Sequence, residues 1–70
     1  MSAIKAKEVR LIDILHTINE NEHIVLHVVI QGKRWCYPDK VSSLELRFSR
    51  ELSCPVKALT CSDGVINIYI

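Results

Sequence analysis

The C-terminal segment, residues 55–70, constrains the fold more than any other part of the sequence. Its end places isoleucine at every second position, Ile66, Ile68 and Ile70, which is the period of a β-strand with one buried face. The Ser-Asp-Gly turn at 62–64 joins this run to the preceding one and predicts a β-hairpin. Left unpaired, such a strand would be prone to aggregation. We therefore expect this hairpin to anchor a sheet, and residues 1–70 to form one complete small domain.

The composition is that of a globular protein with no strong bias in charge. Hydrophobic residues make up 49% of the 70 positions and charged residues 24%, which argues against a disordered chain. Nine Lys and Arg face eight Asp and Glu, and the two signs are interspersed. Bulk charge therefore indicates neither a nucleic-acid nor a membrane partner. A chain this short has a thin stability margin, and self-association into a homodimer would supplement it.

Sequence features relevant to location favour the cytoplasm. The longest apolar run, residues 24–30, is too short to span a bilayer and is interrupted by His27. The N-terminal residues contain no apolar core of a signal peptide. The three cysteines, Cys36, Cys54 and Cys61, are odd in number and adjoin strand-like sequence. This usage predicts a reduced protein in which the thiols are buried and act as small hydrophobic groups.

The N-terminal half predicts a helix followed by a hairpin. Apolar residues recur with helical period over about 5–19, and a polar break follows. Residues 23–30 form the strongest strand pattern in the chain. A turn at 31–33 centred on glycine then leads to a second strand at 34–37, which Pro38 is expected to end because it has no N–H to donate.

The middle segment is compatible with either a strand or a helix. Residues 44–49 alternate between apolar and polar, which is strand period. The Ser-Ser-Leu-Glu sequence at 42–45 matches a capping box, and Leu, Glu and Arg favour helix. We favour a short helix at 43–52, ended by Pro55. The predicted fold is thus α+β, with the order helix, β-hairpin, short helix, β-hairpin, and an antiparallel four-stranded sheet packed with helices.

The strand at 23–30 is apolar on both of its faces. Val25, His27 and Val29 lie opposite the face that carries Ile24, Leu26, Val28 and Ile30. Helices on one side alone would leave the second face to be covered by a partner, whereas helices on both sides would cover it within the chain. Both arrangements remain open. In the first, Val25, His27 and Val29 are candidate protein-binding residues.

The sequence favours neither a metal site, nor nucleophilic catalysis, nor a phosphate-binding loop. His23 and His27 on one strand would stand about 13 Å apart at about 3.3 Å per residue, too far for one metal ion. Cys36 could contact His27 across the first hairpin, but a small sheet has little room for a catalytic pocket. The two glycines are explained by turns rather than by a phosphate loop. We expect no enzyme activity, no metal and no cofactor.

A nucleic-acid site is the alternative function. Lys33, Arg34, Trp35 and Tyr37 place cations beside aromatic side chains, a combination used for phosphate contact and base stacking. Strand alternation, however, puts Trp35 and Tyr37 together and away from Arg34, and the two rings would then cap the core.

The order of elements resembles a group of small proteins from mobile elements. A helix of the type Val9-Arg-Leu-Ile-Asp-Ile-Leu15 precedes an Ile/Val strand, and Lys40-Val-Ser-Ser-Leu44 and a closing strand at 62–70 follow. This pattern is similar to uncharacterised proteins of phages, prophages and conjugative elements of Gram-positive bacteria. The resemblance implies an accessory role in a mobile element and names no functional residue. The favoured function is a small, non-catalytic interaction protein, accessory or inhibitory, that binds another protein or a second copy of itself.

Overall fold

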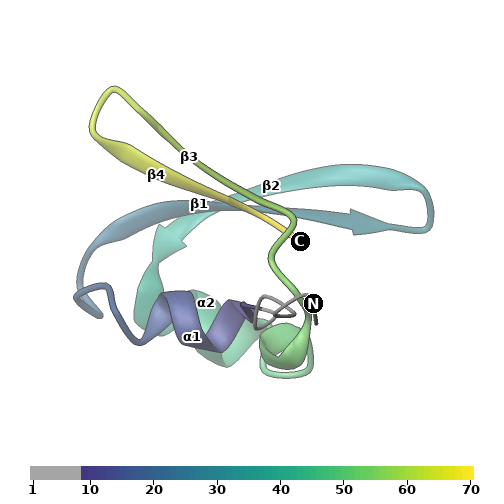
Figure 1. Cartoon of the computed structure of the whole chain (residues 1–70), viewed down its shortest axis with the longest axis horizontal. Coiled ribbons are helices and arrows are strands. Elements are labelled where there is room, and N and C mark those ends of the chain that lie inside the picture. The colour runs from purple at the N-terminus through teal and green to yellow at the C-terminus, as the bar shows by residue number, and fades with distance from the viewer. Residues whose placement is uncertain (1–8) are drawn as a thin grey trace, which may run out of the picture.

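The computed structural model describes residues 9–70 (Figure 1). It has the predicted order of a helix, a hairpin, a short helical segment and a second hairpin. The elements are α1 (Leu11–Leu15), β1 (His23–Ile30), β2 (Lys33–Lys40), α2 (Val41–Arg47), the short 3₁₀ helix η1 (Glu51–Ser53), β3 (Ala58–Ser62) and β4 (Val65–Tyr69). Among residues 9–70, no helix is long and apolar enough to cross a membrane.

The four strands form one mixed sheet in the order β2-β1-β4-β3. Each hairpin is antiparallel, but the two central strands, β1 and β4, pair in parallel, so the prediction of a purely antiparallel sheet is wrong. The reason lies in the connection between the hairpins. Residues 41–57 run beneath the sheet and carry the chain back to its opposite end, where β3 begins (Figure 1). The second hairpin therefore starts in the direction of β2, and β4 returns in the direction of β1.

Both hairpins close through two-residue turns. Gln31 and Gly32 in the first turn, and Asp63 and Gly64 in the second, all have positive φ angles between 51° and 79°. Two consecutive residues in this region form the type I′ turn, whose twist matches that of the flanking strands. Both predicted turns are therefore confirmed in position, and they set the register of each strand pair.

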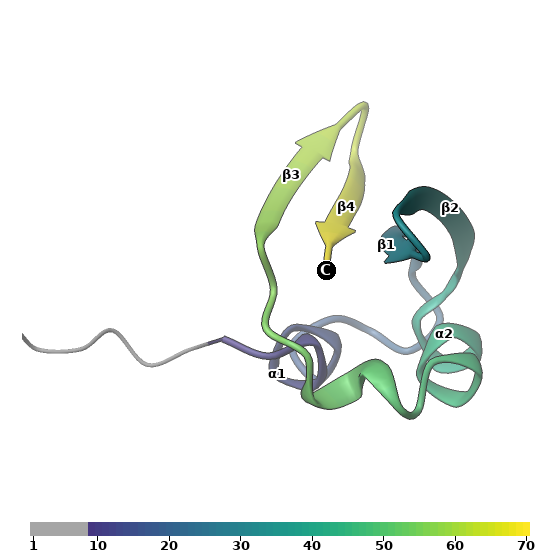
Figure 2. The same ribbon diagram turned by 90° about the vertical axis from the view of Figure 1, so that its right-hand side faces the viewer.

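Both helical segments cover the same face of the sheet (Figures 1 and 2). Within residues 9–70, the opposite face is covered by no other element. Of the two arrangements that the sequence leaves open, the structure therefore has the one-sided one. The buried core lies between the helical layer and the sheet and consists of Leu11, Leu15, Ile24, Leu26, Val28, Val41, Leu44, Phe48, Ile68 and Ile70.

The first helix is shorter than the predicted range of 5–19, part of which lies outside the described residues. Over the described part, α1 covers only Leu11–Leu15. The Asp13 carboxylate accepts a hydrogen bond from the backbone N–H of Arg10 at 3.1 Å, which satisfies a donor at the start of the helix. Beyond Leu15 the hydrogen bonds tighten, because Thr17 N–H donates to Ile14 and not to Asp13. This tightening ends the helix.

The middle segment is helical, as favoured, but its boundaries differ from the prediction. The helix α2 begins at Val41, and Lys40 occupies the N-cap, so the predicted capping box at 42–45 is wrong. The first two N–H groups of the helix are satisfied by backbone carbonyls of the loop between α1 and β1. Val41 N–H donates to Glu22 at 3.0 Å, and Ser42 N–H donates to Glu20 at 3.0 Å. A tertiary contact thus replaces the side-chain cap.

The strand β2 continues past Pro38 to Lys40, so the prediction that this proline ends the pairing is wrong. Because β2 lies at the edge of the sheet, one side of its backbone has no neighbouring strand among residues 9–70. A proline at an edge strand can direct its missing donor to that side without losing a hydrogen bond of the ladder.

Candidate functional site

The face of the sheet that the helices leave uncovered is the candidate site, and it is called the open face below. It is built from every second residue of each strand, as the strand registers define. It comprises His23, Val25, His27 and Val29 of β1, Arg34, Cys36, Pro38 and Lys40 of β2, Val65, Asn67 and Tyr69 of β4, and Ala58, Thr60 and Ser62 of β3.

All three residues predicted to bind a protein lie on the open face. Val25 and His27 are half-buried between neighbouring strands, and Val29 is 42% exposed. A central strand with one solvent-facing side is normally polar on that side. On β1, two of the three residues in this stretch are valine. The open face is therefore more apolar along its centre than solvation alone requires.

The charges of the open face have one sign. Arg34 and Lys40 are its cationic side chains, and none of its strand positions carries a carboxylate. Asp39, the acidic residue within the described strands, pairs with Ile24 and so belongs to the helix-covered side. The nearly neutral chain thus presents a locally positive face.

Three polar side chains from three strands meet at the middle of the open face. Cys36 of β2 lies directly opposite His27 of β1, and the Cys36 Sγ is 3.2 Å from the His27 Nδ1. On the other side of the same ring, the His27 Nε2 is 3.0 Å from the Asn67 Oδ1 of β4. The contact between Cys36 and His27 that the sequence allowed is therefore present, and Asn67 joins it.

The hydrogen bonds around Asn67 assign the protons of this cluster. The Asn67 Nδ2 donates to the backbone carbonyl of Val65 at 3.3 Å, so its Oδ1 is the atom turned toward His27. An amide oxygen only accepts, so the His27 Nε2 carries a hydrogen and donates it. In the neutral ring, Nδ1 then has a free lone pair, which accepts the S–H of Cys36.

Tyr69 stacks on the histidine, and Arg34 lies over the Tyr69 ring. The rings of His27 and Tyr69 are stacked, with centroids 4.1 Å apart and planes inclined by 13°. The guanidinium carbon of Arg34 lies 5.4 Å from the centre of the Tyr69 ring. The stack on Tyr69 holds the imidazole between its two polar partners, and it occupies one face of the tyrosine ring.

The prediction that the thiols are buried is wrong. Cys36 and Cys61 are exposed and Cys54 is half-buried, and all three are free. Cys36 points to the open face, whereas Cys61 lies on the hairpin formed by β3 and β4, which projects away from the helical layer (Figure 2). Strand-like sequence therefore did not imply burial, because Cys36 lies on the face that the helices leave uncovered and Cys61 lies on a hairpin that projects away from them.

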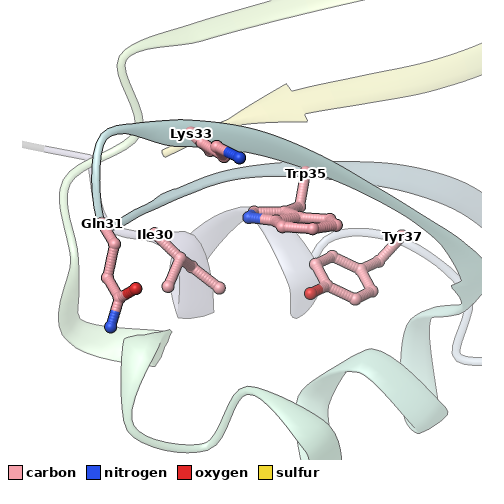
Figure 3. A pocket seen from close by; sticks show the side chains of 5 residues that line it. All are labelled: Ile30, Gln31, Lys33, Trp35 and Tyr37. Carbon is pink, nitrogen blue, oxygen red and sulfur yellow. The ribbon is translucent and has the colours of Figure 1, made fainter.

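The residues predicted to bind nucleic acid do not form one patch. Lys33, Trp35 and Tyr37 lie on the helix-facing side of the first hairpin, where with Ile30 and Gln31 they line a cavity of about 410 Å³ (Figure 3). Arg34 lies on the opposite side of the same strand, as alternation predicts. Of the two rings, Tyr37 packs against the core through an edge contact with Phe48, and Trp35 remains 49% exposed.

Within the described part of the chain, no three His, Cys, Asp or Glu side chains converge as metal ligands. Comparison of the chain with protein-family models, with curated proteins and with solved structures found no match. The geometry of the open face is thus the basis on which a function can be proposed.

Sequence reasoning missed two residues of this cluster, Asn67 and Tyr69. Both stand between the isoleucines of the C-terminal strand, so alternation alone places them on the side away from the core. The sequence could not predict that these two residues lie beside His27, because this depends on the parallel pairing of β4 with β1. The signal that was available is a polar amide and an aromatic ring on the outer face of an otherwise apolar strand.

Proposed function

We propose that this chain is a small, non-catalytic protein-binding module that docks a partner protein on the open face of its sheet. The single observation that carries the proposal is the one-sided packing of the helices. It leaves Val25 and Val29, which an ordinary solvated face would not need, on the uncovered side of the central strand β1. Apolar side chains gathered on such a surface and rimmed by polar ones are typical of a binding site.

The charge of the open face favours an acidic partner over a second copy. Arg34 and Lys40 stand at the rim with no carboxylate on the same face to balance them. Two copies placed face to face would bring cations toward cations, which an interface avoids. A partner surface or segment that mixes Asp or Glu with apolar side chains complements both features. We therefore identify the partner as another protein of that chemistry.

Selection from a random peptide library displayed on phage tests this proposal with the purified chain. Enriched peptides should combine acidic residues with Val, Ile, Leu or Phe. Arg34→Glu should abolish their binding, and Lys33→Glu is the matched control. The two residues are adjacent and each substitution changes the charge equally, but Lys33 belongs to the helix-facing side. Equal loss in both variants, or no enrichment, would overturn the proposal. So would a dimer in light scattering that Arg34→Glu dissociates and Lys33→Glu does not.

Nucleic acid is the second candidate, and it rests on the same absence of carboxylates from the open face. A partly exposed tyrosine beside an arginine, as with Tyr69 and Arg34, can stack a base and contact a phosphate. One face of the Tyr69 ring is already taken by His27, however, and Trp35 lies on the other side of the sheet. Single-stranded oligonucleotide at low salt should therefore leave the fluorescence of Trp35 and the mobility of the chain unchanged. Binding that weakens with salt would favour this candidate instead.

The resemblance to proteins of mobile elements suggests a biological context for the proposed function. In that setting the partner is a protein of the host or of the element, and the module acts as an accessory or inhibitor in the cytoplasm. The mobile-element origin and the cytoplasmic location stay predictions.

A further inference from the structure

We propose that Cys36 is a reactive thiol that exchanges with small disulfides bearing anionic groups, with His27 as its base and Asn67 as the residue that positions this base. The inference does not rest on the proposed docking function. It rests on the order of atoms across the open face, which is sulfur, imidazole and amide oxygen, joined at 3.2 and 3.0 Å. This is the relation of nucleophile, base and orienting group that activates cysteine in unrelated folds.

Each member of the cluster is held by a different strand. Cys36 stands on β2, His27 on β1 and Asn67 on β4, so the sheet itself fixes their spacing. The imidazole is also held by its stack on Tyr69, and the amide by its bond to the Val65 carbonyl. A base held on both sides in this way loses little freedom when it takes a proton.

The exposure of Cys36 selects the kind of reaction. Its thiol is exposed on the open face, so a small solute can reach it. Thiol–disulfide exchange requires only that a thiolate approach one sulfur of a disulfide. Hydrolysis of an acyl compound would in addition require a pocket and donors for an oxyanion. Exchange is therefore the reaction that fits this surface.

The proposed step balances without any further reactant. The His27 Nδ1 accepts the proton of the Cys36 thiol, and the resulting thiolate attacks one sulfur of the disulfide RSSR. A bond forms between the Cys36 Sγ and that sulfur, while the bond between the two R-bearing sulfurs breaks. The leaving RS⁻ takes the proton from the imidazolium. The products are the mixed disulfide and one molecule of RSH, so the oxidation of Cys36 matches the reduction of one sulfur of RSSR.

Arg34 gives the site a preference for anionic disulfides. It is two residues from Cys36 on the same strand and the same face, about 7 Å along the strand. No strand position of the open face carries a carboxylate to offset it. A disulfide whose substituents bear carboxylates is thus attracted to the thiol, and a cationic one is repelled.

Two variants that each leave one exposed thiol test the reactivity directly. The double variant Cys54→Ser, Cys61→Ser leaves Cys36, and Cys36→Ser, Cys54→Ser leaves Cys61. Cys61 is the matched control because it is also exposed on a strand but makes no side-chain hydrogen bond in residues 9–70. With 5,5′-dithiobis(2-nitrobenzoate) and a chelator at neutral pH, Cys36 should react at least about tenfold faster, below the ~10²–10⁴ of an enclosed general base. Equal rates would overturn the proposal.

Substitutions of the two helper residues separate activation from simple exposure. In the variant that retains only Cys36, His27→Phe keeps a ring for Tyr69 to stack on but removes both nitrogens, so the acceleration should be lost. With neutral 4,4′-dithiodipyridine as the reagent, Asn67→Ala should lose most of the acceleration, and Asn67→Asp should restore it because a carboxylate accepts the same hydrogen bond. Circular dichroism of each variant checks that the fold is kept. Unchanged rates in His27→Phe, or failure of Asn67→Asp to exceed Asn67→Ala, would contradict these roles.

The charge preference has its own test. Arg34→Gln should slow the reaction of Cys36 with the anionic 5,5′-dithiobis(2-nitrobenzoate) and leave the rate with neutral 4,4′-dithiodipyridine unchanged. Lys33→Gln, on the other side of the strand, should alter neither rate. Equal slowing with both reagents would mean that Arg34 acts on the structure of the site, which would refute the preference.

Discussion

The helix-covered face and the open face take their side chains alternately from the same strands. On the covered face, Ile24, Leu26 and Ile68 are 1% exposed or less, and their contacts are apolar. On the open face, their neighbours His27 and Asn67 are joined by hydrogen bonds and remain in part exposed. Apolar packing on the covered face is therefore enough to hold the strands together. The open face can then carry polar and reactive groups.

Removal of residues 66–70 should have the largest effect on stability, because it should destroy both faces of the sheet. The deletion takes most of β4, which lies in the centre of the sheet, together with the buried Ile68 and Ile70. Both faces should then be lost at once, with the whole free energy of unfolding, on the order of 5–15 kcal/mol for a small domain. Thermal denaturation followed by circular dichroism measures this. An unchanged melting temperature would show that β4 does not join the two hairpins.

A pair of substitutions on β1 should show that the two faces contribute unequally to stability. Leu26→Ala removes a side chain that is 1% exposed on the covered face and should lower the free energy of unfolding by about 2–5 kcal/mol. Val29→Ala, three residues away on the open face, should lower it by about 1 kcal/mol or less. Urea denaturation of both variants provides the comparison. Similar losses would mean that something covers the open face in solution.

A smaller effect than that of Leu26→Ala is expected at the second turn, which sets the register of β3 and β4. Gly64 has φ of 76°, and an added Cβ would meet no atom within 4 Å, so Gly64→Ala carries a purely conformational penalty of about 1–2 kcal/mol. Gly64→Asn is the control, because asparagine tolerates this conformation better. Asparagine should therefore be the milder substitution in urea denaturation, and the reverse order would exclude the left-handed conformation at this position.

Local patterns in the sequence predicted the local parts of the fold. Alternating isoleucines and the Asp63-Gly64 pair identified the second hairpin, and the apolar run at 23–30 identified the first. Alternation also placed Arg34 away from Trp35 and Tyr37. These features depend on neighbours within a few residues, for which strand period and turn chemistry are sufficient.

The parts that could not be predicted depend on contacts between distant segments. The parallel pairing of β1 with β4 follows from the path of residues 41–57, which no local pattern encodes. The start of α2 is set by carbonyls of a distant loop in place of its own serine. The same holds for the candidate site. The contact between Cys36 and His27 could be predicted from the first hairpin alone, but the contact between His27 and Asn67 could not.

The seam between the two hairpins consists of only three residue pairs, Val25 to His27 with Asn67 to Tyr69. The hydrogen bond between His27 and Asn67 crosses this seam. A chain caught midway through folding, with each hairpin made but the seam still open, would hold a thiol whose base is not yet aligned. In the variant that retains only Cys36, a brief pulse of a thiol reagent at successive times after dilution from denaturant would thus time the closing of the seam at a single atom.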